Sequence, residues 1–281
     1  NSIVSEEEIK EASALVPEKL RDAIQLAKRN IHKFHEEQTS TVFVETTQGV
    51  SCWQEKRPIQ KVGLYIPGGT APLFSTVLML AVPAQIAGCK EIVLCSPPNK
   101  EGKIHPAILY AATLCGVTKI IKVGGIQAIA AYTFGTENIP KVYKIFGPGN
   151  QYVTVAKQLA TKYGVAIDMP AGPSELLVVA DDAAKASYVA SDLLSQAEHG
   201  ADSQVLLVST SKKMLAEVSD EIQKQLLALP RAEIAQKAIH NSKSIFVEND
   251  EIALELINEY GPEHFIVCTK NNDYYIENIE N

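Results

Sequence analysis

The sequence has no apolar run of about 18 residues, the length that a membrane-spanning helix needs. Its most hydrophobic stretch, residues 74–87, is interrupted by Pro83 and Gln85. The N-terminal residues are acidic and lack the basic and then apolar order of a secretory signal. Lys and Arg form no cluster and the formal net charge is −7, which does not suit a nucleic-acid surface. We therefore expect a soluble protein that binds neither membranes nor nucleic acids.

Cysteines are few, odd in number and scattered, as Cys52, Cys89, Cys95, Cys115 and Cys268. Most of them lie in apolar segments, and their spacing does not suggest a disulfide framework. This distribution is typical of reduced thiols in a reducing compartment. The sequence therefore predicts a cytoplasmic protein, or a plastid protein if the source is a plant.

What the sequence does contain is an alternation of short apolar strands and helices. From Lys61 the strands read "KVGLYIPGG", "EIVLCSPP", "KIIKVGG", "KVYKIFGPG" and "VAIDMPAGP", and a second series reads "ELLVVAD", "SQVLLVST", "KSIFVEN" and "FIVCT". The pattern indicates βα units around largely parallel sheets with helices on their faces. We expect an α/β protein with two doubly wound modules that divide near "MPAGPSE".

The residues before Lys61 predict two helices and a strand pair. Ser5 and Glu8 have the spacing of a capping box, which marks the start of a helix. A second helix begins near Pro17, with an apolar stripe of Leu20, Ile24, Ala27, Ile31 and Phe34. The segment "TVFVETTQ" alternates like a half-exposed strand, and we expect it to pair with "GVSCWQEKRPI".

Three glycine-rich turns, "GLYIPGG", "VGGIQ" and "FGPGNQY", each follow a strand and precede a helix. Backbone N–H groups at such turns can receive an anion such as a pyrophosphate, and open sheets of this kind bind ligands beyond the carboxyl ends of their strands. None of the turns has the dinucleotide fingerprint G-x-G-x-x-G. Tight strand-to-helix turns without a ligand explain the glycines equally well.

The segment "DLLSQAEHGADSQ" places Gln196 and His199 one helical turn apart, with Asp192 and Ser195 on neighbouring lines. The pair could be half of a metal site, a substrate contact or the polar end of a helix. Zinc prefers His, Cys and carboxylate ligands, so Gln196 would be an unusual one. Spacing alone favours the polar helix end.

The segment "NEYGPEHFIV" places Glu263 and His264 together after a Gly-Pro turn and before an apolar strand. Adjacent side chains there diverge, so a histidine could remove a proton while a carboxylate activates water. A solvated loop is the plain alternative. Cys115 is a further candidate, because oxidation of an aldehyde through a thiohemiacetal would need a thiol.

Longer segments carry a resemblance to a known family. The strings "VGLYIPGGTAPLFSTVLMLAVPAQIAGCKEIVLCSPP", "VGGIQAIAAYTFGTE", "KIFGPGNQYVT", "AIDMPAGPSE", "ASDLLSQAEHGADSQ" and "YGPEHFI" together resemble histidinol dehydrogenase, in order from about Lys61 to Cys268. The resemblance implies two degenerate Rossmann-like modules, residues 1–65 plus 174–281 on the metal and substrate side and residues 66–173 on the NAD side. It also implies a homodimer that oxidises L-histidinol to L-histidine through the aldehyde with zinc and NAD, the last step of histidine biosynthesis.

The resemblance also assigns roles to individual residues. Gln196 and His199 match zinc ligands that border the substrate, Glu263 matches the residue that activates water, and His264 matches the general base. Ser174 and His264 match substrate contacts, and Tyr65, Gln127 and Asn150 match the cofactor-binding positions. The family uses no catalytic cysteine, which argues against Cys115.

The family completes its zinc shell with an aspartate and a histidine further along the chain, in a C-terminal region exchanged between subunits, and this sequence ends at Asn281. We therefore expect the chain as given to bind zinc weakly and to turn over poorly. Two alternatives remain. One is an aldehyde dehydrogenase-like enzyme that uses a cysteine thiol, and the other is a non-catalytic ligand-binding or oligomerisation form.

Overall fold

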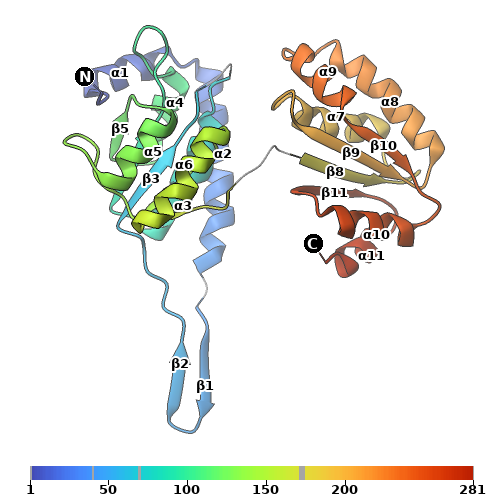
Figure 1. Cartoon of the computed structure of the whole chain (residues 1–281), viewed down its shortest axis with the longest axis horizontal. Coiled ribbons are helices and arrows are strands. Elements are labelled where there is room, and N and C mark those ends of the chain that lie inside the picture. The colour runs from blue at the N-terminus through green and yellow to red at the C-terminus, as the bar shows by residue number, and fades with distance from the viewer. Residues whose placement is uncertain (1, 40, 69–70, 171–174, 281) are drawn as a thin grey trace. The chain divides into compact units, whose positions relative to one another are not determined.

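The computed structural model describes residues 2–39, 41–68, 71–170 and 175–280. The chain divides into a first unit, Asn1–Ala171, and a second unit, Gly172–Asn281, each built around its own parallel sheet (Figure 1). Within the described ranges, no helix combines the length and the apolar character needed to cross a membrane.

The sheet of the first unit has five parallel strands in the order β5-β4-β3-β6-β7. The first strand along the chain lies in the middle, so the direction of winding reverses between β3 and β6, which is the arrangement of a doubly wound fold. The strands are β3 (Lys61–Tyr65), β4 (Glu91–Cys95), β5 (Lys119–Ile121), β6 (Lys144–Phe146) and β7 (Ala166–Ile167).

Helices cover both faces of this sheet and enclose two apolar cores. Residues Val62, Leu64 and Ile66 point into one core, and Tyr65 points into the other, as the twofold alternation of a strand requires. The helices that follow the strands are α3 (Phe74–Ala87), α4 (Pro106–Leu114), α5 (Gly125–Phe134), α6 (Gln151–Ala160) and the short η2 (Thr161–Tyr163). Their burial confirms the alternating βα interpretation of the sequence.

The two N-terminal helices, α1 (Glu6–Leu15) and α2 (Glu18–Glu36), belong to the first unit. In α2, Gln25 donates to the Tyr110 hydroxyl at 3.0 Å, and Lys28 Nζ donates to the Leu114 carbonyl at 2.7 Å. Both partners lie in α4. This placement differs from the grouping of residues 1–65 with 174–281, because α2 packs on α3 and α1 packs on α4. Phe34, the last residue of the apolar stripe of α2, is 67% exposed.

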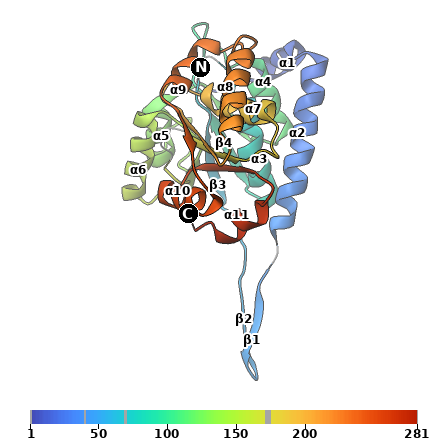
Figure 2. The ribbon, with the colours of Figure 1, turned by 90° about the vertical axis from the view of Figure 1, so that its right-hand side faces the viewer.

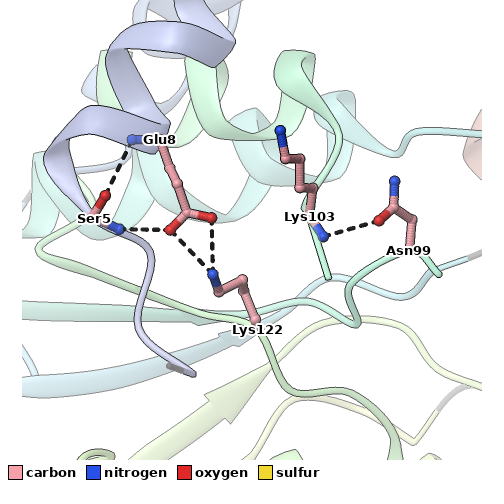
Figure 3. A network of polar contacts seen from close by, with 5 residues as sticks. All are labelled: Ser5, Glu8, Asn99, Lys103 and Lys122. Carbon is pink, nitrogen blue, oxygen red and sulfur yellow. Dashed lines mark hydrogen bonds and ion pairs between the residues drawn. The ribbon is translucent and has the colours of Figure 1, made fainter. Parts of the chain in front are cut away.

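The capping box that the sequence predicts is present at the start of α1. The Glu8 N–H donates to the Ser5 hydroxyl at 3.2 Å, and the Ser5 N–H donates to the Glu8 carboxylate at 3.0 Å (Figure 3). Lys122, just after β5, donates to both oxygens of Glu8 and holds the pKa of that carboxyl below its usual range. The two hydrogen bonds from Lys122 therefore anchor α1 to the edge of the sheet.

Between α2 and β3, after the short η1 (Glu37–Thr39), the chain forms an antiparallel ribbon of β1 (Phe43–Thr47) and β2 (Val50–Trp53). The pairing of these two segments confirms the sequence prediction. The ribbon extends away from the sheet of its unit (Figures 1 and 2). Every residue of both strands is exposed, including Phe43 and Trp53, so neither face is the buried one that the alternation suggests.

The second unit repeats the same winding with four parallel strands in the order β10-β9-β8-β11. One face carries α7 (Ala186–Ala197), α8 (Lys212–Leu226) and α9 (Ala232–His240), and the other carries α10 (Asp250–Tyr260) and α11 (Asn272–Asn278). The strands are β8 (Glu175–Ala180), β9 (Gln204–Ser209), β10 (Lys243–Phe246) and β11 (His264–Cys268). The prediction of two Rossmann-like modules with parallel sheets is confirmed.

Candidate functional site

The three candidate cofactor residues lie at the carboxyl ends of strands in the first unit. Tyr65 is the last residue of β3, Gln127 lies in the first turn of α5 after β5, and Asn150 immediately precedes α6 after β6. The ends of β3 and β6 flank the point where the winding reverses, which is where open α/β sheets bind ligands. The structure therefore gathers these segments at the edge that the sequence analysis expects.

Tyr65 connects two of the glycine-rich turns directly. Its hydroxyl accepts the Gly125 N–H at 3.0 Å, so the phenol caps the first amide of α5. Tyr65 is 4% exposed, and burial raises the pKa of its phenol, an effect that the Gly125 N–H partly offsets. The hydroxyl stays protonated near neutral pH and can still donate one hydrogen bond.

Gly147 brings the third turn against Tyr65. A Cβ built at Gly147 would lie 2.1 Å from the Tyr65 carbonyl oxygen, and its φ of +126° is in the region that favours glycine. A Cβ built at Gly68 or at Gly124 would lie 2.5 Å from an atom of the Pro97 ring. Packing within the chain therefore accounts for these three glycines, and no ligand is needed to explain them.

A buried ion pair, which the sequence analysis missed, braces the turn after β6. Lys157 of α6 is 4% exposed and contacts the Asp168 carboxylate. Lys157 Nζ donates to the Gly147 carbonyl at 2.6 Å, and the Gly147 N–H donates to Asp168 Oδ2 at 2.7 Å. A lysine on the buried side of α6 was the only signal in the sequence that could have revealed this pair.

Asn150 has a structural role whether or not it binds a cofactor. Its side-chain oxygen accepts the N–H groups of Tyr152 and Val153, both at 3.1 Å, and so caps α6. Gln127 is exposed on α5, whose N-cap residue is Gly124 and whose first amide is bonded to the Tyr65 hydroxyl. Side chains occupy one amide at the start of α5 and two at the start of α6, so α5 leaves more of its amide donors available to an anion.

In the second unit, Gln196 and His199 lie at the end of α7. The helix ends at Ala197, and the Glu198 and His199 N–H groups bond to Leu194 and Gln196 carbonyls at 3.1 Å. His199 is therefore in the turn beyond the helix, contrary to the expectation that both residues are helical. Gln196 is 7% exposed, and its Nε2 is buried without a hydrogen-bond partner, whereas His199 is exposed.

Glu263 and His264 lie at the start of β11, where Glu263 Oε1 is 3.8 Å from His264 Nε2. Both side chains are partly exposed, at 44% and 57%. The two groups thus face each other and do not diverge as adjacent residues of an extended segment usually do. Their proximity allows the carboxylate to orient the imidazole.

Both candidate motifs of the second unit lie at the amino edge of its sheet. Because α7 returns against the strand direction, its end lies beside the start of β9, and His264 itself starts β11. The strands β9 and β11 flank β8, so their starts are about 10 Å apart. Ligands of open α/β sheets usually bind at the carboxyl edge, so these motifs lie at the edge opposite to the expected one. Ser174, the predicted substrate contact, lies outside the described residues.

The described residues contain no group of three His, Cys, Asp or Glu side chains placed to hold a metal ion. Gln196 and His199 are two donors, one of them an amide. Cys115 is fully buried at the end of α4, and burial raises the pKa of its thiol to about 11. A thiol with so high a pKa is a poor nucleophile at neutral pH.

The two units, each a parallel sheet wound in the same order with helices on both faces, define a Rossmann-like α/β protein. The family model of histidinol dehydrogenase matches residues 1–281. The chain is 63% identical to histidinol dehydrogenase from Bacteroides thetaiotaomicron over 278 residues, which are 99% of this chain and 64% of that protein. It is 54% identical to the Escherichia coli histidinol dehydrogenase, covering 98% of this chain and 63% of that protein. The chain belongs to the histidinol dehydrogenase family.

Solved structures agree with this assignment. The crystal structure of histidinol dehydrogenase from Elizabethkingia anophelis matches this chain with a TM-score of 0.96 and 55% sequence identity. The match covers all of this chain and 65% of the Elizabethkingia chain. The chain thus spans less than two thirds of the length of these relatives. An acetylating aldehyde dehydrogenase from Geobacillus thermoglucosidasius has a TM-score of 0.58 at 15% identity, over 96% of this chain and 73% of that one, which shows a shared fold alone.

Proposed function

We propose that the protein oxidises L-histidinol to L-histidine through the aldehyde, as a zinc-dependent and NAD-linked enzyme that works as a homodimer. Membership of the histidinol dehydrogenase family supports the reaction. The observation that carries the site assignment is that Gln196, His199, Glu263 and His264 share the amino edge of one sheet.

The pair at the start of β11 suits proton transfer. His264 acts as the base that takes the proton of the substrate hydroxyl, and the Glu263 carboxylate lies 3.8 Å from its imidazole. In the second oxidation, Glu263 activates the water that adds to the aldehyde. Partial exposure of both side chains leaves them accessible to substrate and water.

The end of α7 fits a zinc ligand set in one respect. Gln196 is 7% exposed, and its side chain would bind a metal ion through its amide oxygen, since the Nε2 group carries protons and cannot bind a cation. His199 supplies an imidazole three residues further on. When bound there, zinc would orient the substrate by its imidazole and amine.

The zinc assignment predicts a loss of metal on substitution. Gln196→Ala and His199→Ala should each lower the zinc affinity of the full-length protein by about 100-fold or more, because even groups behind the ligands contribute about 10- to 100-fold. Zinc per chain is measured after dialysis against a competing chelator. The matched control is Ser195→Ala, whose exposed hydroxyl donates to the Asp192 carbonyl of its own helix. Full zinc content in both variants would contradict the assignment.

The carboxyl edge of the first unit is the proposed NAD site. Tyr65, Gln127 and Asn150 lie on the segments that follow β3, β5 and β6 at this edge, next to the start of α5, where the Tyr65 hydroxyl occupies the first amide. The N–H groups of that helix can receive the pyrophosphate, and the Tyr65 hydroxyl retains one proton to donate. Bound NAD would accept the hydride in both oxidations.

A second candidate function, oxidation of an aldehyde through a cysteine thiol, is favoured only by the shared fold. Under our proposal, Cys115→Ala keeps kcat with histidinol within about twofold, since the thiol is fully buried and its pKa is raised to about 11. Steady-state NADH formation measures this. A folded Cys115→Ala protein with no activity would favour the thiol mechanism.

A further inference from the structure

Tyr260 is the last residue of α10 and stands directly before the turn that carries the candidate catalytic pair. Gly261 ends the helix with a φ of +57°, and Pro262 leads to Glu263 and His264 at the start of β11. The Tyr260 ring is partly buried. Tyr260 is therefore only three positions before Glu263 along the chain.

The hydroxyl of Tyr260 reaches the first residues of two other strands. It donates to Glu175 Oε2 at the start of β8, and it lies 3.0 Å from Gln204 Oε1 at the start of β9. A hydroxyl has one proton, and Tyr260 donates it in a hydrogen bond to the carboxylate. The Gln204 amide lies beside this hydrogen bond. Burial, and then the Glu175 carboxylate, raise the pKa of Tyr260, so the phenol remains a donor at neutral pH.

These two partners belong to the segments that carry the other candidate site residues. Glu175 follows Ser174, the predicted substrate contact, along the chain, and Gln204 starts the strand that comes after the turn holding His199. One phenol hydroxyl thus joins three segments, each of which holds a residue assigned to metal, substrate or proton transfer. The mechanism proposed above does not use this hydroxyl.

We propose that Tyr260 is a positioning residue that holds these three segments of the site in register, an inference that rests on the proposed function. It touches neither substrate nor cofactor in this account. Its hydrogen bond to Glu175 fixes the turn at Gly261, and that turn sets the place of Glu263 and His264. A reacting group that is displaced by about 1 Å can lose about 100-fold in rate, so modest loosening has a measurable effect.

A matched control is a second phenol that bonds to the other end of α10. The Tyr275 hydroxyl of α11 donates to Asp250 at 2.9 Å, and Asp250 is the first residue of α10. This pair is also a phenol bonded to a carboxylate, but it lies at the carboxyl edge of the sheet. Tyr275→Phe therefore removes a comparable hydrogen bond without contact with the candidate site.

The experiment compares Tyr260→Phe and Tyr275→Phe in the full-length protein. We expect Tyr260→Phe to lower kcat with histidinol by on the order of 10-fold, with the KM for NAD within about twofold. Tyr275→Phe should keep kcat within about twofold even if the protein unfolds at a lower urea concentration. Equal kcat for both variants, or equal losses in both, would overturn the positioning role.

A second measurement does not depend on the reaction. Hydrogen–deuterium exchange of the peptide that spans residues 261–264 should be at least about 10-fold faster in Tyr260→Phe and unchanged in Tyr275→Phe. Unchanged exchange in both variants overturns the positioning role. If the wild-type protein does not oxidise histidinol, the proposed function fails, and this comparison still decides whether Tyr260 orders the turn.

Discussion

Replacing His264 with Asn is expected to lower kcat with histidinol by about 100- to 10,000-fold, because the variant keeps the shape of the side chain and loses its base. Binding of NAD should be unaffected, since the cofactor residues belong to the first unit. Steady-state NADH formation and NAD titration measure the two effects. A variant that retains wild-type kcat would remove His264 from the mechanism.

Glu263→Gln should separate the two oxidations. The amide cannot take a proton from water, so the first hydride transfer continues while the second slows by about 100-fold or more. With limiting histidinol and excess NAD, the early yield falls from two NADH per histidinol toward one. The exposed Glu259 of α10 provides the control, as Glu259→Gln should still yield two. A yield of two at wild-type rate from Glu263→Gln would contradict the assignment.

Breaking the Lys157–Asp168 pair is the largest expected effect on stability. Lys157→Met leaves Asp168 without its cation beside the Gly147 turn, and loss of one partner of a buried pair costs about 3 to 5 kcal/mol. The Asp168 side chain is 27% exposed, so we expect about 3 kcal/mol. The variant should also raise the KM for NAD, because the Gly147 turn leads to Asn150.

Urea unfolding followed by circular dichroism measures this loss. The control is Lys213→Met on α8, where the partner Glu217 is 3.6 Å away and both side chains are largely exposed, at 76% and 49%. A surface pair of this kind contributes little. If Lys157→Met is no less stable than Lys213→Met, the buried pair does not brace the first unit.

Local sequence patterns predict the elements of this fold well, because each depends on neighbours along the chain. The capping box of Ser5 and Glu8 and the nine strands from Lys61 onward are present where the patterns place them. The unit to which α1 and α2 belong was not predictable in this way. An apolar stripe shows that a helix packs on something, but it does not specify which sheet.

The candidate site shows the same limit. Local motifs singled out Gln196, His199, Glu263 and His264, and the resemblance gave them roles. The spacing of Gln196 and His199 did not reveal that α7 ends between them. Lys157 with Asp168, and Tyr260 with Glu175, join residues that are far apart along the chain or on different elements. Such pairs depend on tertiary packing, and a single sequence carries no spacing rule for them.

The most direct test of the account is the yield of NADH per histidinol from the full-length protein with zinc present. We predict two NADH per histidinol, with L-histidine as the product, and loss of this yield in Gln196→Ala, His199→Ala and His264→Asn. No NADH from histidinol, or an unchanged yield of two in all three variants, would contradict the claim that these residues form one oxidising site.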